Sequence, residues 1–184
     1  SATVDDMELI DSKIEGITGS IYFSAKTDMG LFIIAGKGDN TYTKDISFLL
    51  DLGGNDTYRN NAGGYTKNSA INVLVDLQGD DMYSSTYDYS QGSGFLGYGI
   101  LIDTQGDDLY RSLRTSQGVG FFGYGAIIDW DGDDSYLAQE FSQGVALGGK
   151  GFIFDRKGKD QYQAALFSQA VGLTHGIGSI FDIS

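Results

Sequence analysis

The chain has 184 residues, no cysteine, no proline and 28 glycines, and 25 acidic against 12 basic side chains give a net charge of −13. The lack of cysteine excludes disulfides, thiol nucleophiles and thiolate metal sites, and the negative charge argues against nucleic acid and anionic membrane surfaces as partners. No apolar run reaches membrane-spanning length, so the sequence predicts no membrane span, whereas cations and neutral glycans are compatible with its charge.

The sequence divides into an irregular beginning and a long repeat. Residues 1–30 repeat poorly, and we expect them to form an irregular N-terminal coil or cap. Along residues 31–184 an apolar triplet followed by aspartate recurs at spacings of 25, 27, 26, 26 and 27 residues. These repeated aspartates are Asp51, Asp76, Asp103, Asp129, Asp155 and Asp182. The copy between Asp51 and Asp76 is atypical, because it lacks the Ser-Gln-Gly of later copies.

The repeat predicts the fold. A unit of about 26 residues with short β-like stretches between glycine turns, and no helical periodicity, cannot bury an apolar face by itself. Stacked units bury it, with equivalent residues about 4.8 Å apart. A propeller blade needs about 40 residues, which is too many for this unit. The sequence therefore predicts an all-β parallel β-helix, or β-solenoid, with about 26 residues per coil and six to seven coils.

The turn after each triplet is acidic, and stacking would place these acids on one corner. Two carboxylates about 4.8 Å apart repel by about 0.9 kcal/mol in water and about 3.5 kcal/mol at an effective dielectric constant of about 20. A hard divalent cation would relieve this repulsion, and calcium tolerates variable oxygen geometry better than magnesium does. The alternative is that these residues cap their own tight turns and need no metal. The candidate calcium ligands are Asp51, Asp56, Asp76, Asp80, Asp81, Asp103, Asp107, Asp108, Asp129, Asp131, Asp133, Asp134, Asp155 and Asp160.

Three of these turns resemble known calcium-binding repeats. Residues 53–58, Gly-Gly-Asn-Asp-Thr-Tyr, and residues 106–110, Gly-Asp-Asp-Leu-Tyr, are similar to the glycine-aspartate turns of RTX β-rolls, although RTX units are nine residues long. Residues 129–134, Asp-Trp-Asp-Gly-Asp-Asp, resemble the loops of dockerins and thrombospondin-type repeats. The RTX resemblance implies calcium held between successive coils. It implies ligand roles for Asp56, Asp81, Asp108, Asp134 and Asp160.

Other residue types also recur once per coil. A tyrosine follows seven residues after each of the first five anchoring aspartates, and an earlier copy contributes Tyr42. These tyrosines predict a stacked aromatic column, with a glycan-binding strip as the alternative. The glutamine of Ser-Gln-Gly predicts an amide ladder, and its serine lacks a partner base. The only histidine, His175, is expected in a solvated turn.

The apolar triplets predict a covered outer face. Alternate residues of a strand face opposite sides, yet all three positions are apolar in copies such as Ile100, Leu101 and Ile102. One side fills the core, and the other side requires a cover, such as a second copy of the protein or a neighbouring domain. The sequence stops where an acidic turn should follow Asp182, which fits a fragment of a longer repeat protein or an end that stacks on a partner.

The leading hypothesis is an extracellular or cell-surface structural module, stabilised by calcium, that mediates adhesion or self-assembles into fibres through open ends or an apolar outer face. Calcium outside cells is abundant enough to fill weak sites. The expected partners are the protein itself or adjoining repeats, with glycans as a further possibility, and no enzymatic activity is expected. The alternatives are a β-helix polysaccharide lyase or glycoside hydrolase, or a glycan-binding module. An enzyme would require an irregular cleft, whereas these copies vary little.

Overall fold

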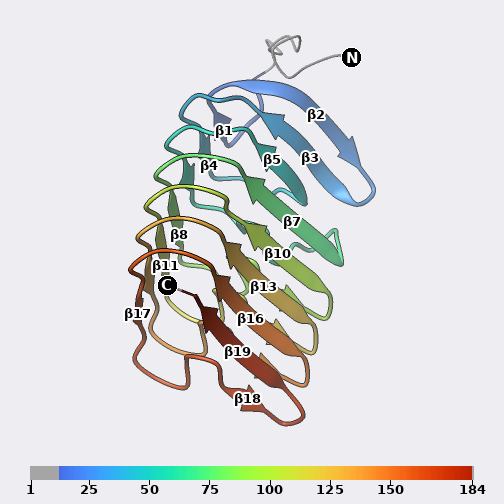
Figure 1. Cartoon of the computed structure of the whole chain (residues 1–184). Helices are drawn as coiled ribbons and strands as arrows, with labels where there is room; N and C mark the ends of the chain where they lie inside the picture. The colour runs from blue at the N-terminus through green and yellow to red at the C-terminus, as the bar shows by residue number, and fades with distance from the viewer. Residues whose placement is uncertain (1–12, 184) are drawn as a thin grey trace.

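A computed structural model describes residues 13–183 as a β-solenoid. Figure 1 shows the chain winding coil upon coil from β2 to β19. The all-β parallel fold and the period of about 26 residues are confirmed, with about five turns where six to seven coils were expected. The earliest turn is shorter than the others, since the paired residues Ile33 and Leu49 are 16 positions apart. No helix long and apolar enough to span a membrane occurs among the described residues.

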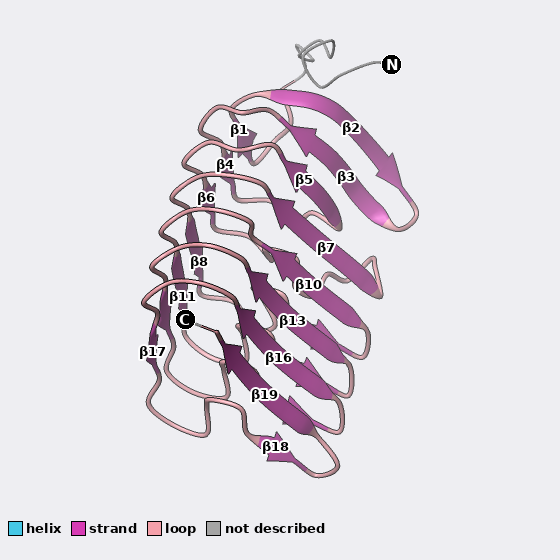
Figure 2. Ribbon diagram, in the orientation of Figure 1, coloured by secondary structure: helices cyan, strands magenta, loops and turns pink. Residues whose placement is uncertain are grey.

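Three sheets run along the solenoid, as Figure 2 shows. The first contains eight strands: β2 (Ile21–Thr27), β3 (Gly30–Ala35), β5 (Phe48–Asp51), β7 (Ile71–Asp76), β10 (Tyr98–Ile102), β13 (Tyr124–Asp129), β16 (Lys150–Asp155) and β19 (Ile177–Asp182). The second contains seven: β1 (Ile17–Thr18), β4 (Thr41–Tyr42), β6 (Thr57–Tyr58), β8 (Met82–Ser85), β11 (Leu109–Ser112), β14 (Ser135–Leu137) and β17 (Gln161–Gln163). The third contains four: β9 (Gly94–Phe95), β12 (Gly120–Phe121), β15 (Ala146–Leu147) and β18 (Gly172–Leu173).

The N-terminal strands differ from the rest in direction. β2 pairs antiparallel with β3, and β1 pairs antiparallel with β4, whereas every other strand pairing in the three sheets is parallel. Residues 13–30 therefore leave the solenoid pattern and cover the first coil. Residues 1–12 of the predicted cap lie outside the described residues.

Buried and partly exposed residues alternate within each triplet, and this alternation shows which face of the eight-stranded sheet points into the core. The middle residues of successive triplets, such as Leu101, Ile127 and Ile153, are fully buried. Their neighbours on either side, such as Ile128 and Phe154, point outward and are only partly buried. The outer face is thus apolar, as the sequence predicts, but it is partly exposed to solvent, and its cover by a second copy or a neighbouring domain stays a prediction.

The glycine of the acidic turn is required by the close approach of successive coils. A β carbon at Gly106 would lie 1.6 Å from the carbonyl oxygen of Gly79, and one at Gly158 would lie 1.6 Å from that of Gly132. Both positions also have φ near +140°, which side chains disfavour. The glycines therefore set how tightly the acidic turns stack.

Candidate metal centre

Two of the three acidic positions in the turn lie inside the solenoid. The aspartates that end the strands of the eight-stranded sheet form one buried column, called here the anchor column. Its fully buried members are Asp51, Asp76, Asp103, Asp129 and Asp155. The aspartates five residues later form a second column, called the turn column. It comprises Asp56, Asp81, Asp108 and Asp134, which are at most 3% exposed, and the partly buried Asp160.

The anchor column is hydrogen-bonded to tyrosines. The Tyr83 hydroxyl donates to Asp103 Oδ2 at 2.5 Å, and Tyr110 donates to Asp129 in the same way at 2.5 Å. Each tyrosine comes from the coil before that of its aspartate, so the bond ties neighbouring coils together. Burial and the neighbouring carboxylates raise the pKa of Tyr83 and Tyr110 well above the ordinary value, so both remain donors at neutral pH.

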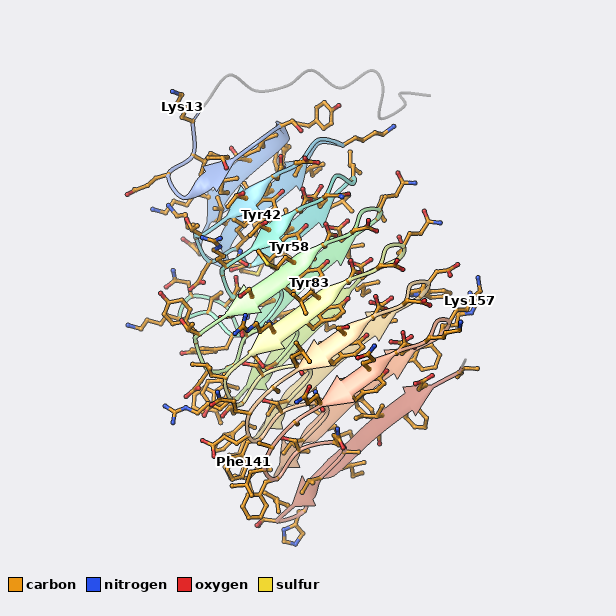
Figure 3. The ribbon with its side chains drawn as sticks, turned by 90° about the vertical axis from the view of Figure 1, so that its left-hand side faces the viewer. Lys13, Tyr42, Tyr58, Tyr83, Phe141 and Lys157 are labelled. Carbon is orange, nitrogen blue, oxygen red and sulfur yellow. The ribbon has the colours of Figure 1, made fainter. Side chains whose placement is uncertain are left out.

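The tyrosines themselves form the stacked column that the sequence predicts. Successive rings lie 4.6–4.9 Å apart with interplanar angles of 3–10°. Figure 3 shows Tyr42, Tyr58 and Tyr83 following one another along the solenoid. The first five rings are fully buried and the last, Tyr162, is partly buried. The column is therefore a core element and offers no strip for a glycan.

The turn column bonds to the backbone of the neighbouring coil. One oxygen, Oδ1, accepts the N–H of the equivalent residue in the preceding coil, as from Asp81 to Asp108 at 2.7 Å and from Asp108 to Asp134 at 2.7 Å. The other oxygen, Oδ2, is buried in Asp81, Asp108, Asp134 and Asp160 with no N–H or O–H donor among the described residues, and the nearby carboxyl group is that of the anchor-column aspartate five residues earlier. A buried carboxylate oxygen without a partner is costly, and a proton or a cation would remove that cost.

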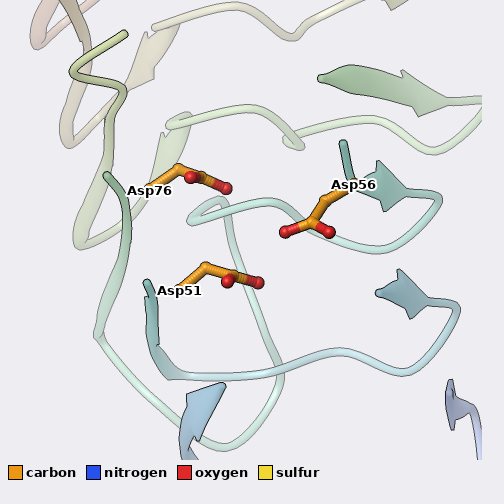
Figure 4. Close-up of side chains that lie close together, drawn as sticks. All are labelled: Asp51, Asp56 and Asp76. Carbon is orange, nitrogen blue, oxygen red and sulfur yellow. The ribbon is translucent and has the colours of Figure 1, made fainter. Parts of the chain in front are cut away.

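The two columns meet in groups of three carboxylates. Figure 4 shows Asp51, Asp56 and Asp76 turned toward one another. Within each group one oxygen per residue lies within 4.8 Å of the others. The four groups, called here the triads, are Asp51–Asp56–Asp76, Asp76–Asp81–Asp103, Asp103–Asp108–Asp129 and Asp134–Asp155–Asp160. Each combines aspartates from two adjacent coils, which is an all-oxygen donor set suited to a hard cation.

Burial in the triads changes the charge of the turn column. Burial, together with nearby carboxylates, raises the pKa of Asp56 to about 9, of Asp81 to about 10, of Asp108 to about 12 and of Asp134 to about 9. In the anchor column burial raises the pKa to about 6 in Asp76, about 8 in Asp103, about 6 in Asp129 and about 7 in Asp155. Without a cation, Asp56, Asp81, Asp108 and Asp134 therefore hold protons at neutral pH.

The remaining predicted ligands lie outside the triads. Asp80, Asp107 and Asp133 are exposed, and Oδ1 of each accepts a backbone N–H from the next coil at 2.8–3.0 Å. Asp131 is exposed and forms an ion pair with Lys157 at 2.7 Å. We expected all of these acids on one corner. The structure separates them into an exposed column that caps the backbone of the next coil and two buried columns that meet.

The Ser-Gln-Gly residues have structural roles. Gln91, Gln117 and Gln143 are fully buried, and each side-chain amide donates to one carbonyl of its own coil and one of the next. Ser90 and Ser116 bond through their hydroxyls at 3.0 Å. His175 is exposed in a turn with φ of 62°. The glutamines stack in a buried column, but they bond to backbone carbonyls of two successive coils and not to one another, and their Oε1 atoms have no hydrogen-bond partner among the described residues, so the predicted amide-to-amide ladder is not formed.

A comparison of the chain with protein families, curated proteins and solved structures finds no match. The chemistry of the site is therefore inferred from its geometry alone. Sequence reasoning missed the burial of the aspartates and their bonds to tyrosine. The constant offset of seven residues between aspartate and tyrosine was the available signal, because a fixed offset in a stacked repeat brings two columns side by side.

Proposed function

We propose that this chain is an extracellular structural module, without enzymatic activity, whose core binds calcium ions along the solenoid. The observation that carries the proposal is the buried, unpartnered Oδ2 of Asp81, Asp108 and Asp134, which adjoins the anchor column. A divalent cation there would neutralise two carboxylates at once and tie adjacent coils together.

The donor set favours calcium over other cations. Calcium–oxygen distances are about 2.3–2.6 Å, so two ligand oxygens on opposite sides of one ion lie about 5 Å apart. The 4.8 Å limit on oxygen separations in the triads is compatible with that size. Carboxylates without imidazole or thiolate disfavour zinc and copper. The resemblance of the turns to RTX repeats supports the same ion, and weak sites of this kind fill at the calcium level found outside cells.

The proposed structural role includes self-association. The outer face of the eight-stranded sheet carries partly exposed apolar residues, including Ile128, Phe152 and Phe154, and Phe32 stacks on Phe48 at 4.4 Å. A second copy of the chain, or adjoining repeats, would cover this face and remove it from water. Adhesion or fibre formation would follow from repeated contacts of this kind.

Thermal unfolding in calcium, magnesium and chelator tests the proposal. At calcium 100-fold above Kd, each independent site adds about 2.7 kcal/mol to the free energy of unfolding, so several sites produce a large rise in Tm. We expect calcium to raise Tm strongly and magnesium to raise it less. A Tm that is the same in calcium and in chelator contradicts the proposal.

A matched pair of variants locates the effect. The double substitution Asp108→Asn with Asp134→Asn removes one buried carboxylate from each of two triads. Asp107→Asn with Asp133→Asn changes the adjacent, exposed positions of the same turns. We expect the first variant to lose much of the calcium-dependent rise in Tm and to be more stable than the parent in chelator near neutral pH. The second variant should keep the calcium-dependent rise, and equal losses in both variants contradict the assignment to the core.

A further inference from the structure

A cavity of about 910 Å³ opens where the repeat is irregular. Its walls come from the turn between β2 and β3, the loop between β4 and β5, and the loops that follow β6 and β8. Figure 2 shows the β2–β3 turn and the loop that precedes β7 projecting on the same side of the solenoid. The loop that follows β6 belongs to the atypical coil that begins at Asp51. We call the cavity the first-coil groove.

The walls of the first-coil groove are held in place by buried polar contacts. Asn61 occupies the place of Gln91 in the previous coil, since the backbone N–H of Gln91 donates to the Asn61 carbonyl at 2.9 Å. The Asn61 side chain donates to the carbonyls of Ile46 and Gly64 and accepts the Ile46 N–H at 3.0 Å. A groove with fixed walls binds a ligand without a large ordering cost.

The lining carries charged side chains of both signs beside apolar ones such as Leu31. Six charged side chains line the groove: Lys26, Lys44, Lys67, Asp28, Asp45 and Asp88. Asp88 is already paired with Arg114 at 3.1 Å, which leaves Asp28 and Asp45 opposite the three lysines. The three lysine ammonium groups make no hydrogen bond or ion pair with another residue of 13–183, so their donors are available to a ligand.

Two tyrosines line the groove together with the aliphatic side chains of Ile14 and Leu31. Tyr87 is 67% exposed, which is unusual for a large aromatic side chain. Tyr65 is less exposed, and its ring is braced by the edge of Phe95 at 5.3 Å. The groove therefore offers one braced and one free aromatic ring among hydrogen-bond donors and acceptors.

This combination selects a ligand class. Charged side chains of both signs favour a ligand rich in hydroxyl groups over a purely anionic one, and they disfavour a wholly apolar ligand. A neutral saccharide fits both constraints, because its hydroxyls donate to carboxylates and accept from ammonium groups while its C–H faces lie on aromatic rings. We infer that the first-coil groove binds a neutral oligosaccharide. The volume is near the upper end of the usual range for ligand sites, about 300–1,000 Å³, so a chain of several sugars fits.

Calorimetric titration with neutral oligosaccharides tests the inference. The probes are cellohexaose, xylohexaose, hexa-N-acetylchitohexaose and maltohexaose, with oligogalacturonate as the acidic comparison, each up to about 10 mM, since weak sites have Kd of about 1 mM. We expect at least one neutral probe to bind and oligogalacturonate to bind more weakly. No binding of any neutral probe, or preferential binding of oligogalacturonate, overturns the inference.

Two tyrosine variants place the binding in the groove. Tyr87→Ala should weaken binding of the neutral probe by at least about tenfold, because it removes the exposed ring. Tyr98→Ala is the control, since Tyr98 is 48% exposed on the solenoid and does not line the groove. Lys67→Ala provides a second variant in the groove that should also weaken binding. Equal effects of Tyr87→Ala and Tyr98→Ala, or no effect of either groove variant, contradict this location.

Discussion

The free energy of unfolding in the absence of divalent cations should fall as pH rises from 5 to 8. The pKa values of Asp56, Asp81, Asp108 and Asp134 are raised to about 9 or above in the folded protein, whereas an aspartate in the unfolded chain titrates near about 3.9. Between these values the folded state holds protons that the unfolded state has released. Stability is therefore greatest at acidic pH and is lost as pH rises toward the folded pKa values.

The magnitude follows from the number of protons held. Each proton retained only in the folded state contributes a slope of about −1.4 kcal/mol per pH unit. The four aspartates contribute about −5 kcal/mol per pH unit while they keep their protons, and the anchor column, with pKa values of about 6–8, makes the slope steeper at the acidic end of the range. A domain is stabilised by about 5–15 kcal/mol in total, so the cation-free chain should unfold within a few pH units above 5.

Urea unfolding in chelator at pH 5, 6, 7 and 8, followed by circular dichroism, measures this slope. The variant Asp108→Asn with Asp134→Asn removes two titrating groups of the turn column, so its slope should be shallower than that of the parent by about 3 kcal/mol per pH unit. The exposed pair, Asp107→Asn with Asp133→Asn, should leave the slope unchanged. A free energy of unfolding that is flat or rises between pH 5 and 8 would refute the assignment of protons to the turn column.

Three further predictions concern the solenoid itself. Tyr110→Phe leaves Asp129 Oδ2 without its 2.5 Å donor and should lower the free energy of unfolding by about 1–3 kcal/mol in urea titrations, whereas no loss would show that the bond is dispensable. Gly106→Ala forces a β carbon to 1.6 Å from the Gly79 carbonyl oxygen and should cost at least about 1–3 kcal/mol in the same assay; an unchanged midpoint contradicts the close stacking of the acidic turns. Phe154→Lys places a charge on the outer face and should lower the mass measured by sedimentation if a second copy covers that face, and a monomeric parent chain would contradict self-association.

The fold was predictable because the repeat is nearly periodic. The recurrence of the triplet and of its anchoring aspartate determined the number of residues per coil, and the tyrosine at a constant offset predicted the stacked column. The number of turns was harder to predict, because the earliest turn, between β3 and β5, takes only 16 residues. That turn also has Ala35 where later copies have the anchoring aspartate.

The environment of the acids was not predictable from their spacing. Asp107 and Asp108 are neighbours in the sequence, yet Asp107 is exposed and Asp108 lies in the core. The turn geometry decides which of the two faces the tyrosine column, and polarity alone suggests that both are exposed. The first-coil groove had a sequence signal, the missing Ser-Gln-Gly, but its lining comes from loops whose approach depends on the whole fold.

The central claim is that a cation occupies the core between the two aspartate columns. Crystals of the protein grown in calcium, with anomalous scattering data, locate bound calcium directly. We predict anomalous peaks within the triads, for example between Asp103, Asp108 and Asp129, with carboxylate oxygens at about 2.3–2.6 Å. Anomalous peaks confined to the exposed column of Asp80, Asp107 and Asp133, or no peak near any of these aspartates, would contradict the claim.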